Sequence, residues 1–193
     1  MNYIESSLKE AQNTLNTFMA NPVNIAQIEK AVEVFVNSFQ NNGRVFSCGN
    51  GGSMCDSLHF AEELTGRYRK DRIPLPATGI SEAGHITCIA NDFGYEYIFS
   101  RFVEAWGQKN DTLLAISTSG NSENVIKAVE VAKSKGMKVV GLLGKDGGKL
   151  KSMVDVALIV DCKITDRIQE VHIKCIHIFI EGIERKLFPD HYL

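Results

Sequence analysis

The chain has 193 residues, of which 44% are hydrophobic and 23% charged, and its formal net charge is −2. This composition is typical of one globular domain, and the charge gives no electrostatic footprint for nucleic acid. No apolar run approaches the ~20 residues that span a bilayer, and the first residues lack the features of a signal peptide. The five cysteines are odd in number and lack C-x-x-C spacing, which indicates reduced thiols. We therefore expect a cytoplasmic protein that binds neither nucleic acid nor membrane.

Two amphipathic helices are predicted within residues 1–40. Apolar residues recur with helical spacing in both, first at Leu8, Ala11, Leu15 and Phe18, and then at Ile25, Ile28, Val32, Phe35 and Phe39. Asn21-Pro22 separates the two helices, because proline is favoured in the first turn of a helix and disfavoured inside one. The Asn41-Asn42-Gly43 turn ends the second helix.

From residue 41 onward, strand and helix patterns alternate. Short apolar runs predict five strands, at 45–48, 76–80, 113–116, 139–143 and 156–160. Helical patterns lie near 54–65, 84–106, 123–135 and 147–153, and a long last helix covers roughly 165–187. This alternation predicts an α/β protein with a doubly wound, five-stranded parallel sheet. Without a repeat or linker, residues 1–193 are expected to form one domain, with a helical pair (1–40) before an α/β core (41–193).

The order of the strands decides where a ligand site lies. In a flavodoxin-like order of 2-1-3-4-5, the switch point falls between the first and third strands, outside their carboxyl ends. The loops that leave these strands are Gly49-Asn50-Gly51-Gly52-Ser53 and Ser117-Thr118-Ser119-Gly120-Asn121-Ser122. The two most polar, glycine-rich loops of the chain would therefore face each other across one crevice.

The second of these loops has the composition of a phosphate site. It offers four hydroxyls, a flexible glycine and the amides of a helix N-terminus, which together suit a cluster of anionic oxygens. It has no lysine, so it is not a Walker A loop, and its neutral donors favour a small phosphate monoester. The alternative is an ordinary strand-to-helix turn with a serine cap.

Candidate chemical groups lie on the helix after the first loop and on the last helix. His59 and Glu63 are four residues apart and could share a metal or a proton, or form an ordinary exposed pair. Gln169 and His177 are separated by about 80° around their helix and about 12 Å along it. They could therefore flank one ligand only by leaning together or by coming from different chains. His172, within the same apolar run, is given no role.

A third polar pair, Asn91-Asp92, precedes Phe93-Gly94 at a predicted helix break. Its amide and carboxylate could bind sugar hydroxyls, and they could equally form an ordinary turn.

These segments together resemble the sugar isomerase (SIS) domain family and, within it, the phosphoheptose isomerases. The matching stretches are residues 47–53, 59–68, 90–94, 116–122 and 166–174. The resemblance covers essentially the whole chain, and its order and content are highly specific. It implies a ketose–aldose isomerase that converts D-sedoheptulose 7-phosphate to D-glycero-D-manno-heptose 7-phosphate through an enediol. This reaction is the first step toward the ADP-heptose of the lipopolysaccharide core.

The resemblance also implies roles for individual residues. Glu63 would be the base that moves a proton between C1 and C2, and His177 its acid–base partner. The phosphate would be held by Ser117, Thr118, Ser119 and Ser122. The sugar would be lined by Asn50, Gly51, Gly52, Ser53, Glu63, Asn91, Asp92 and Gln169. A zinc ion would be bound by His59, Glu63, Gln169 and His177, and the protein would assemble as a homotetramer with sites at subunit interfaces.

Two other functions are considered. A relative of this family binds the replication initiator DnaA without catalysis, and the tail Leu187-Phe188-Pro189-Asp190 is similar to the tail of that relative. This function is not favoured, because that relative resembles a site without the acidic residues, whereas this chain has Glu62-Glu63, Gly120 and His177. A nucleotide-dependent oxidoreductase is not favoured, because Gly49-Asn50-Gly51 lacks the final glycine of G-x-G-x-x-G.

Overall fold

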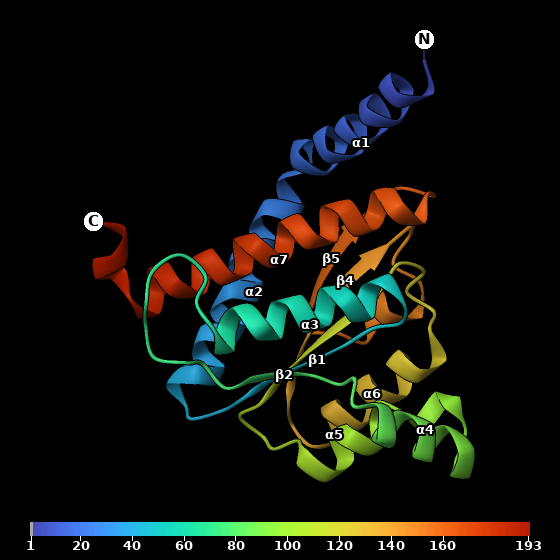
Figure 1. Cartoon of the computed structure of the whole chain (residues 1–193), viewed down its shortest axis with the longest axis vertical. Coiled ribbons are helices and arrows are strands. Elements are labelled where there is room, and N and C mark those ends of the chain that lie inside the picture. The colour runs from blue at the N-terminus through green and yellow to red at the C-terminus, as the bar shows by residue number, and fades with distance from the viewer. Residues whose placement is uncertain (1) are drawn as a thin grey trace.

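The computed structural model describes residues 2–193 and shows one five-stranded, all-parallel sheet with the order β2-β1-β3-β4-β5 (Figure 1). The strands are β1 (Val45–Cys48), β2 (Ala77–Gly79), β3 (Thr112–Ser117), β4 (Lys138–Gly144) and β5 (Val156–Val160). The predicted doubly wound sheet and its flavodoxin-like order are confirmed. Because Cys48 pairs with Ala115, β1 and β3 are neighbours, and the loops that follow them leave the same edge of the sheet.

Helices cover both faces of the sheet. One face is covered by α2 (Pro22–Gln40), α3 (Gly52–Thr65) and α7 (Thr165–Leu187), and the other by α4 (Ala83–Asp92), α5 (Ser100–Trp106) and α6 (Glu123–Ser134) (Figure 1). Three short 3-10 helices complete the fold, η1 (Tyr95–Tyr97), η2 (Lys149–Ser152) and η3 (Pro189–Tyr192). The asparagine that separates α2 from α1 (Tyr3–Ala20) caps α2, with Asn21 Oδ1 accepting the Val23 amide at 3.0 Å.

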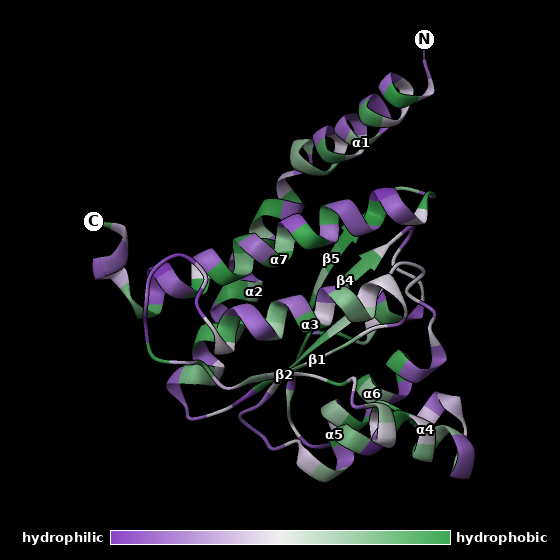
Figure 2. Ribbon diagram, viewed as in Figure 1, coloured by the Kyte–Doolittle hydropathy of each residue, from purple (hydrophilic) through white to green (hydrophobic). Residues whose placement is uncertain are grey.

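The sheet separates two hydrophobic cores. All six residues of β3 are buried, with Leu114 and Ile116 in the core under α2, α3 and α7. Leu113 and Ala115 point the other way, into the core under α5 and α6. This burial on both faces explains why the strands are continuous apolar runs, and Figure 2 shows β4 and β5 in the hydrophobic colour.

Three phenylalanines join the helices of the first face. The Phe35 ring of α2 lies 5.2 Å from the Phe60 ring of α3 and 5.5 Å from the Phe179 ring of α7. All three side chains are fully buried. Such tilted aromatic contacts add to the hydrophobic free energy of the core, so they fix α3 and α7 beside each other.

One helical pattern breaks where predicted, and another does not form an α-helix. The pattern near 84–106 is interrupted after α4, at the predicted break at Phe93-Gly94, because Gly94 has a φ of +110° that a helix cannot accommodate. The helical pattern near 147–153 forms only the 3-10 helix η2, which follows two glycines with positive φ, Gly147 and Gly148.

Helix α1 projects away from the body of the molecule (Figure 1). Of its residues only Phe18 is buried, whereas Leu8 is 67% exposed. Arg167 of α7 ties the helix down, donating to Glu10 Oε2 at 3.1 Å and to Ser7 Oγ at 2.7 Å. The predicted apolar stripe of α1 therefore exists but is mostly not buried within one chain.

His172 is a core residue, as expected for a histidine within an apolar run. Its side chain is fully buried, its Nε2 donates to the Leu143 carbonyl at 3.0 Å, and its Nδ1 has no partner among the described residues. Burial lowers the pKa of His172 from 6.5 to about 4, so the ring is neutral in the folded protein.

We expect His172 to make the protein less stable in acid. The unfolded chain binds a proton near pH 6.5 that the folded chain binds only near pH 4, so this contribution is present above 6.5 and is lost as the pH falls toward 4. The loss is on the order of 3 kcal/mol in the free energy of unfolding. His172→Gln keeps a donor for Leu143 but cannot titrate, so its urea unfolding should show a weaker pH dependence. Equal pH dependence of the two proteins would contradict the assignment.

Candidate active site

The two polar loops face each other at the carboxyl edge of the sheet, as predicted. Asn50, from the loop after β1, exchanges two hydrogen bonds with the buried Asn124 of α6: Asn50 Nδ2 donates to Asn124 Oδ1 at 2.9 Å, and Asn124 Nδ2 donates to Asn50 Oδ1 at 2.8 Å. Tyr95 Oη donates to the same Asn50 oxygen at 2.9 Å. These hydrogen bonds fix the loop after β1 against α6 and η1. They leave one N–H of the Asn50 amide free for a ligand.

Sequence reasoning missed Asn124 and Tyr95. Asn124 lies in the first turn of the helix behind the hydroxyl loop, a position from which a side chain can reach the neighbouring loop. Tyr95 belongs to η1, and its approach to Asn50 follows from the break at Gly94. The sequence could therefore have indicated Asn124, from its place just after the hydroxyl loop, but it carries no such signal for Tyr95.

The hydroxyl loop is prearranged by its own side chains. Ser117 Oγ lies 2.9 Å from Ser122 Oγ and 3.4 Å from Ser119 Oγ, and it accepts the Gly120 amide at 3.1 Å. Ser122 is the N-cap of α6 and makes no side-chain bond to that helix. The loop thus presents hydroxyls beside a helix N-terminus, which suits an anion.

Gly120 allows a second loop to support the hydroxyl loop. Its φ is +65°, and a Cβ at this position would lie 1.9 Å from the Gly147 carbonyl oxygen. The Leu150 amide donates to the Gly120 carbonyl at 3.0 Å, and the Lys149 amide donates to Asn121 Oδ1 at 3.0 Å. The loop after β4 therefore fixes the shape of the hydroxyl loop from behind.

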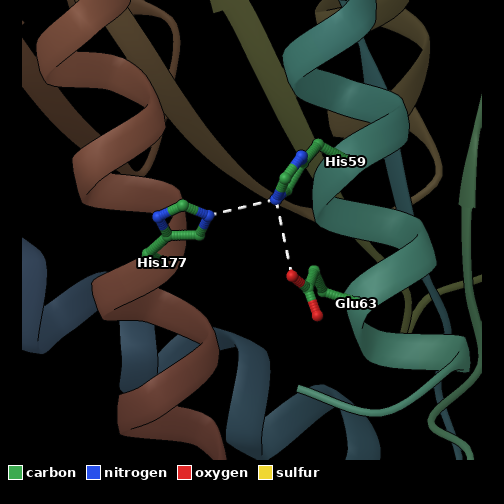
Figure 3. Close-up of side chains that lie close together, drawn as sticks. All are labelled: His59, Glu63 and His177. Atoms are coloured by element: carbon green, nitrogen blue, oxygen red, sulfur yellow. Dashed lines mark hydrogen bonds and ion pairs between the residues drawn. The ribbon is translucent and has the colours of Figure 1, made fainter. Parts of the chain in front are cut away.

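A second group of candidate residues lies between α3 and α7 (Figure 3). His177 Nε2 lies 3.0 Å from His59 Nε2, and His59 Nε2 lies 3.5 Å from Glu63 Oε1. The ligand atoms of all three residues lie within 4.8 Å of one another. Two imidazoles and a carboxylate form a donor set that suits zinc and leaves a coordination position open.

Burial and the neighbouring charges together favour a neutral imidazole at His177. Burial, followed by the neighbouring His59, lowers the pKa of His177, while Glu63 opposes the shift. One turn before His59, burial raises the pKa of Asp56 to about 6, and its Oδ2 has no hydrogen-bond partner among the described residues. A neutral ring can ligate a metal or exchange a proton near neutral pH.

Gln169 does not lie in this cluster. A Cβ at Gly52 would lie 2.5 Å from Gln169 Nε2, so Gln169 packs against the first turn of α3, beside the loop after β1. His59 and His177 come seven and eight residues later on the two helices. Within one chain the structure therefore places Gln169 beside the loop after β1, and not beside His59, Glu63 and His177.

Glu63 lies near the end of α3, away from its first turn. Glu63 follows Gly52 by eleven residues, which corresponds to about 16 Å along α3. The turn that carries Glu63 therefore lies well along α3 from the loop after β1.

The remaining predicted site residues lie in the first turn of α3 and at the end of α4. Ser53 is buried in the first turn of α3, and Gly51, with a φ of +56°, faces open space. Asn91 and Asp92 are exposed at the end of α4, where Asn91 Nδ2 donates to Asp92 Oδ1 at 2.9 Å. Among the described residues, no helix is long and apolar enough to cross a membrane.

Comparison with known proteins defines the class first. The SIS domain family profile matches residues 8–144, so the fold and its polar loops are those of a SIS domain. The phosphoheptose isomerase of Histophilus somni is 57% identical over 182 residues, which cover 94% of this chain and 93% of that protein. The phosphoheptose isomerase of Edwardsiella ictaluri is 55% identical over 185 residues, covering 95% and 96%.

Solved structures agree. The structure of phosphoheptose isomerase GmhA from Neisseria gonorrhoeae superposes with a TM-score of 0.89 at 36% identity and covers 94% of this chain and 97% of that chain. This chain belongs to the phosphoheptose isomerase family and is an aldose–ketose isomerase of the SIS domain class. None of these proteins is named as a partner of a replication initiator, and the alternative of a DnaA-binding protein gains no support.

We expect Gly120→Ala to destabilise the protein more than Gly136→Ala. Both glycines have positive φ, but the nearest atom to a Cβ at Gly136 would be Lys109 Cγ at 3.5 Å, whereas Gly120 would clash with backbone. The backbone strain is therefore matched, and the clash should add about 1–3 kcal/mol to the loss in free energy of unfolding. Urea denaturation of the two variants measures the difference, and equal losses would show that the supporting loop yields freely.

Proposed function

We propose that this protein converts D-sedoheptulose 7-phosphate to D-glycero-D-manno-heptose 7-phosphate, as the first step of ADP-heptose synthesis for the lipopolysaccharide core, in the cytoplasm. The observation that carries this proposal is the carboxylate–imidazole cluster of His59, Glu63 and His177 in a chain whose hydroxyl loop suits a phosphate monoester. Family membership supports the reaction class, and relatives named for phosphoheptose support the substrate.

In this proposal the hydroxyl loop binds the phosphate. Ser117, Thr118, Ser119 and Ser122 donate hydrogen bonds to its oxygens, and the N-terminus of α6 faces the same charge. Neutral donors hold the dianion without a permanent cation, which favours release of a product that carries the same phosphate. Asn50 gives its one remaining N–H to the sugar, which is also lined by Gly51, Gly52, Ser53, Asn91, Asp92 and Gln169.

Glu63 and His177 move the protons. The Glu63 carboxylate removes a proton from C1 of the ketose, the C1–C2 bond becomes the double bond of an enediol, and the protonated carboxyl returns the proton to C2. The His177 ring, neutral because of its lowered pKa, exchanges protons with O1 and O2. No proton or electron is gained or lost overall, so the reaction needs no oxidant.

We also propose that His59, Glu63 and His177 hold one zinc ion in each chain, with Gln169 joining them only where a second chain contributes it. Bound zinc would supply a positive charge that stabilises a developing oxyanion. A metal-bound carboxylate is a weaker base, so the roles of Glu63 as a ligand and as a base compete.

We further propose that the protein forms a homotetramer, in which Gln169 of one chain would approach the His59–Glu63–His177 cluster of another. Leu15, Met19, Ile25 and Ile178 line an open groove of about 470 Å³ between α1, α2 and α7, and His177 lies on its wall. Met19 is 57% exposed and Ile178 46% exposed. A second chain packed on this apolar surface would be placed to bring its hydroxyl loop toward Glu63.

Glu63→Gln and His177→Gln should each lower the rate of isomerisation at least about 100-fold, because each removes one proton carrier. Glu62→Gln is the matched control, since Glu62 is exposed one position away on the same helix. NMR detection of the aldose formed from sedoheptulose 7-phosphate measures the rates. Turnover by either site variant at the wild-type rate would refute the catalytic assignment.

Zinc binding should depend on His59. Isothermal titration of the metal-free protein with zinc should give about one site per chain, and His59→Gln should weaken binding about 10-fold or more, because a ligand is lost. His85→Gln is the control: His85 lies outside the cluster, and its Nε2 bonds the Ile98 carbonyl at 2.9 Å. Unchanged zinc affinity in His59→Gln would place the metal elsewhere.

A further inference from the structure

One face of α7 holds the segment that leaves α3. His177, Glu181 and Glu184 are spaced i, i+4, i+7, so they lie on one stripe of the helix. The His177 ring lies 6.1 Å from the Tyr68 ring, and Glu181 Oε2 lies 2.9 Å from Arg69 Nη2. Glu184 pairs with Arg72. Successive turns of α7 thus contact successive residues of the segment between α3 and β2.

The Arg72–Glu184 pair differs from the others because both side chains have no exposed surface. Arg72 Nε donates to Glu184 Oε1 at 2.9 Å. Tyr192 Oη donates to the other oxygen, Glu184 Oε2, at 2.8 Å. Burial, followed by the bond to Glu184, raises the pKa of Tyr192 to about 12, so the phenol remains a donor. Each oxygen of the buried Glu184 carboxylate therefore accepts a hydrogen bond, one of them from the C-terminal tail.

The other donors of Arg72 bind the end of α3. Arg72 Nη2 donates to the Glu63 carbonyl at 2.7 Å, and Arg72 Nη1 donates to the carbonyls of Leu64 at 2.7 Å and Gly66 at 3.0 Å. The last carbonyls of a helix lack partners within the helix and carry a partial negative charge. A guanidinium binds several of them at once in a fixed plane, which a lysine cannot do.

We propose that Arg72 is a positioning residue for Glu63, locked in place by Glu184 and Tyr192. The backbone carbonyl of Glu63 is bound directly by Arg72, and Glu184 lies seven residues after His177 on the same face of α7. Arg72 therefore sets the distance between the turn that carries the Glu63 carboxylate and the helix that carries His177. This inference rests on the proposed role of Glu63 as the base.

The first test is Arg72→Lys, compared with Arg44→Lys. Arg44 pairs with Asp111 and donates to the carbonyl of Trp106 in α5, on the other face of the sheet, so the same exchange breaks a similar fork away from α3 and α7. Steady-state kinetics and urea unfolding are measured for both. We expect Arg72→Lys to lower kcat at least about tenfold with KM changed less than about threefold, and Arg44→Lys to leave kcat unchanged. A wild-type kcat in folded Arg72→Lys would overturn the proposal.

A second variant separates positioning from stability. Arg72→Met/Glu184→Met replaces the buried pair with apolar side chains of similar volume, an exchange that often preserves stability. It also removes the hydrogen bond that Arg72 donates to the Glu63 carbonyl. If Arg72 positions Glu63, kcat stays at least about tenfold low even where the unfolding free energy equals that of the wild type. A kcat that recovers together with stability would show that the pair is only structural.

Glu63→Gln, assayed in parallel, distinguishes the two proposals. An active Glu63→Gln protein would refute the role of Glu63 as the base, and the positioning role of Arg72 would fall with it. The observed contacts of Arg72 with the end of α3 would not be affected. An inactive Glu63→Gln protein with fully active Arg72→Lys and Arg72→Met/Glu184→Met proteins would retain the base and reject the positioning role of Arg72.

Discussion

The packing of α3 against α7 is the constraint on which the candidate site depends. The two helices run in the same direction, and their seam is fixed at three levels: Gly52 accommodates Gln169 at one end, His59 meets His177 further along, and the last carbonyls of α3 reach α7 through Arg72. Phenylalanine rings beneath this seam join the helices to the core. A change at any level would shift the side chains of His59, Glu63 and His177, because the helices are rigid and densely packed.

The carboxyl edge of the sheet supplies a different kind of order. There the loops carry few apolar side chains, and their shape comes from hydrogen bonds between Asn50 and Asn124 and from the contact of Gly120 with Gly147. Loops held in this way keep their shape without a ligand, so an anion would bind them with little loss of conformational entropy. The same bonds use much of the donor capacity of the loops, which limits how many donors remain for a ligand.

Helix α1 is the element whose apolar side chains stay most exposed in one chain. Leu8 and Met19 recur with the spacing of a core-facing stripe, yet both are largely exposed. An amphipathic helix gains its stability chiefly from covering its apolar face. Met19 also lines the groove that has His177 on its wall, so a partner that covered this part of α1 would lie beside His177.

The sequence by itself determined the five strands and the polar loops after the first and third of them, because these depend on local apolar patterns and on the alternation of strands and helices. The order of the strands comes from a known type of fold, and the structure confirms it. The sequence also predicted that His59 and Glu63 share a helical face. Tertiary structure decided that His177 joins them, that Gln169 lies with the loops, and that α1 stays exposed. Those outcomes depend on how far one helix lies along another and on which surfaces meet, and residue spacing within a single helix carries neither quantity.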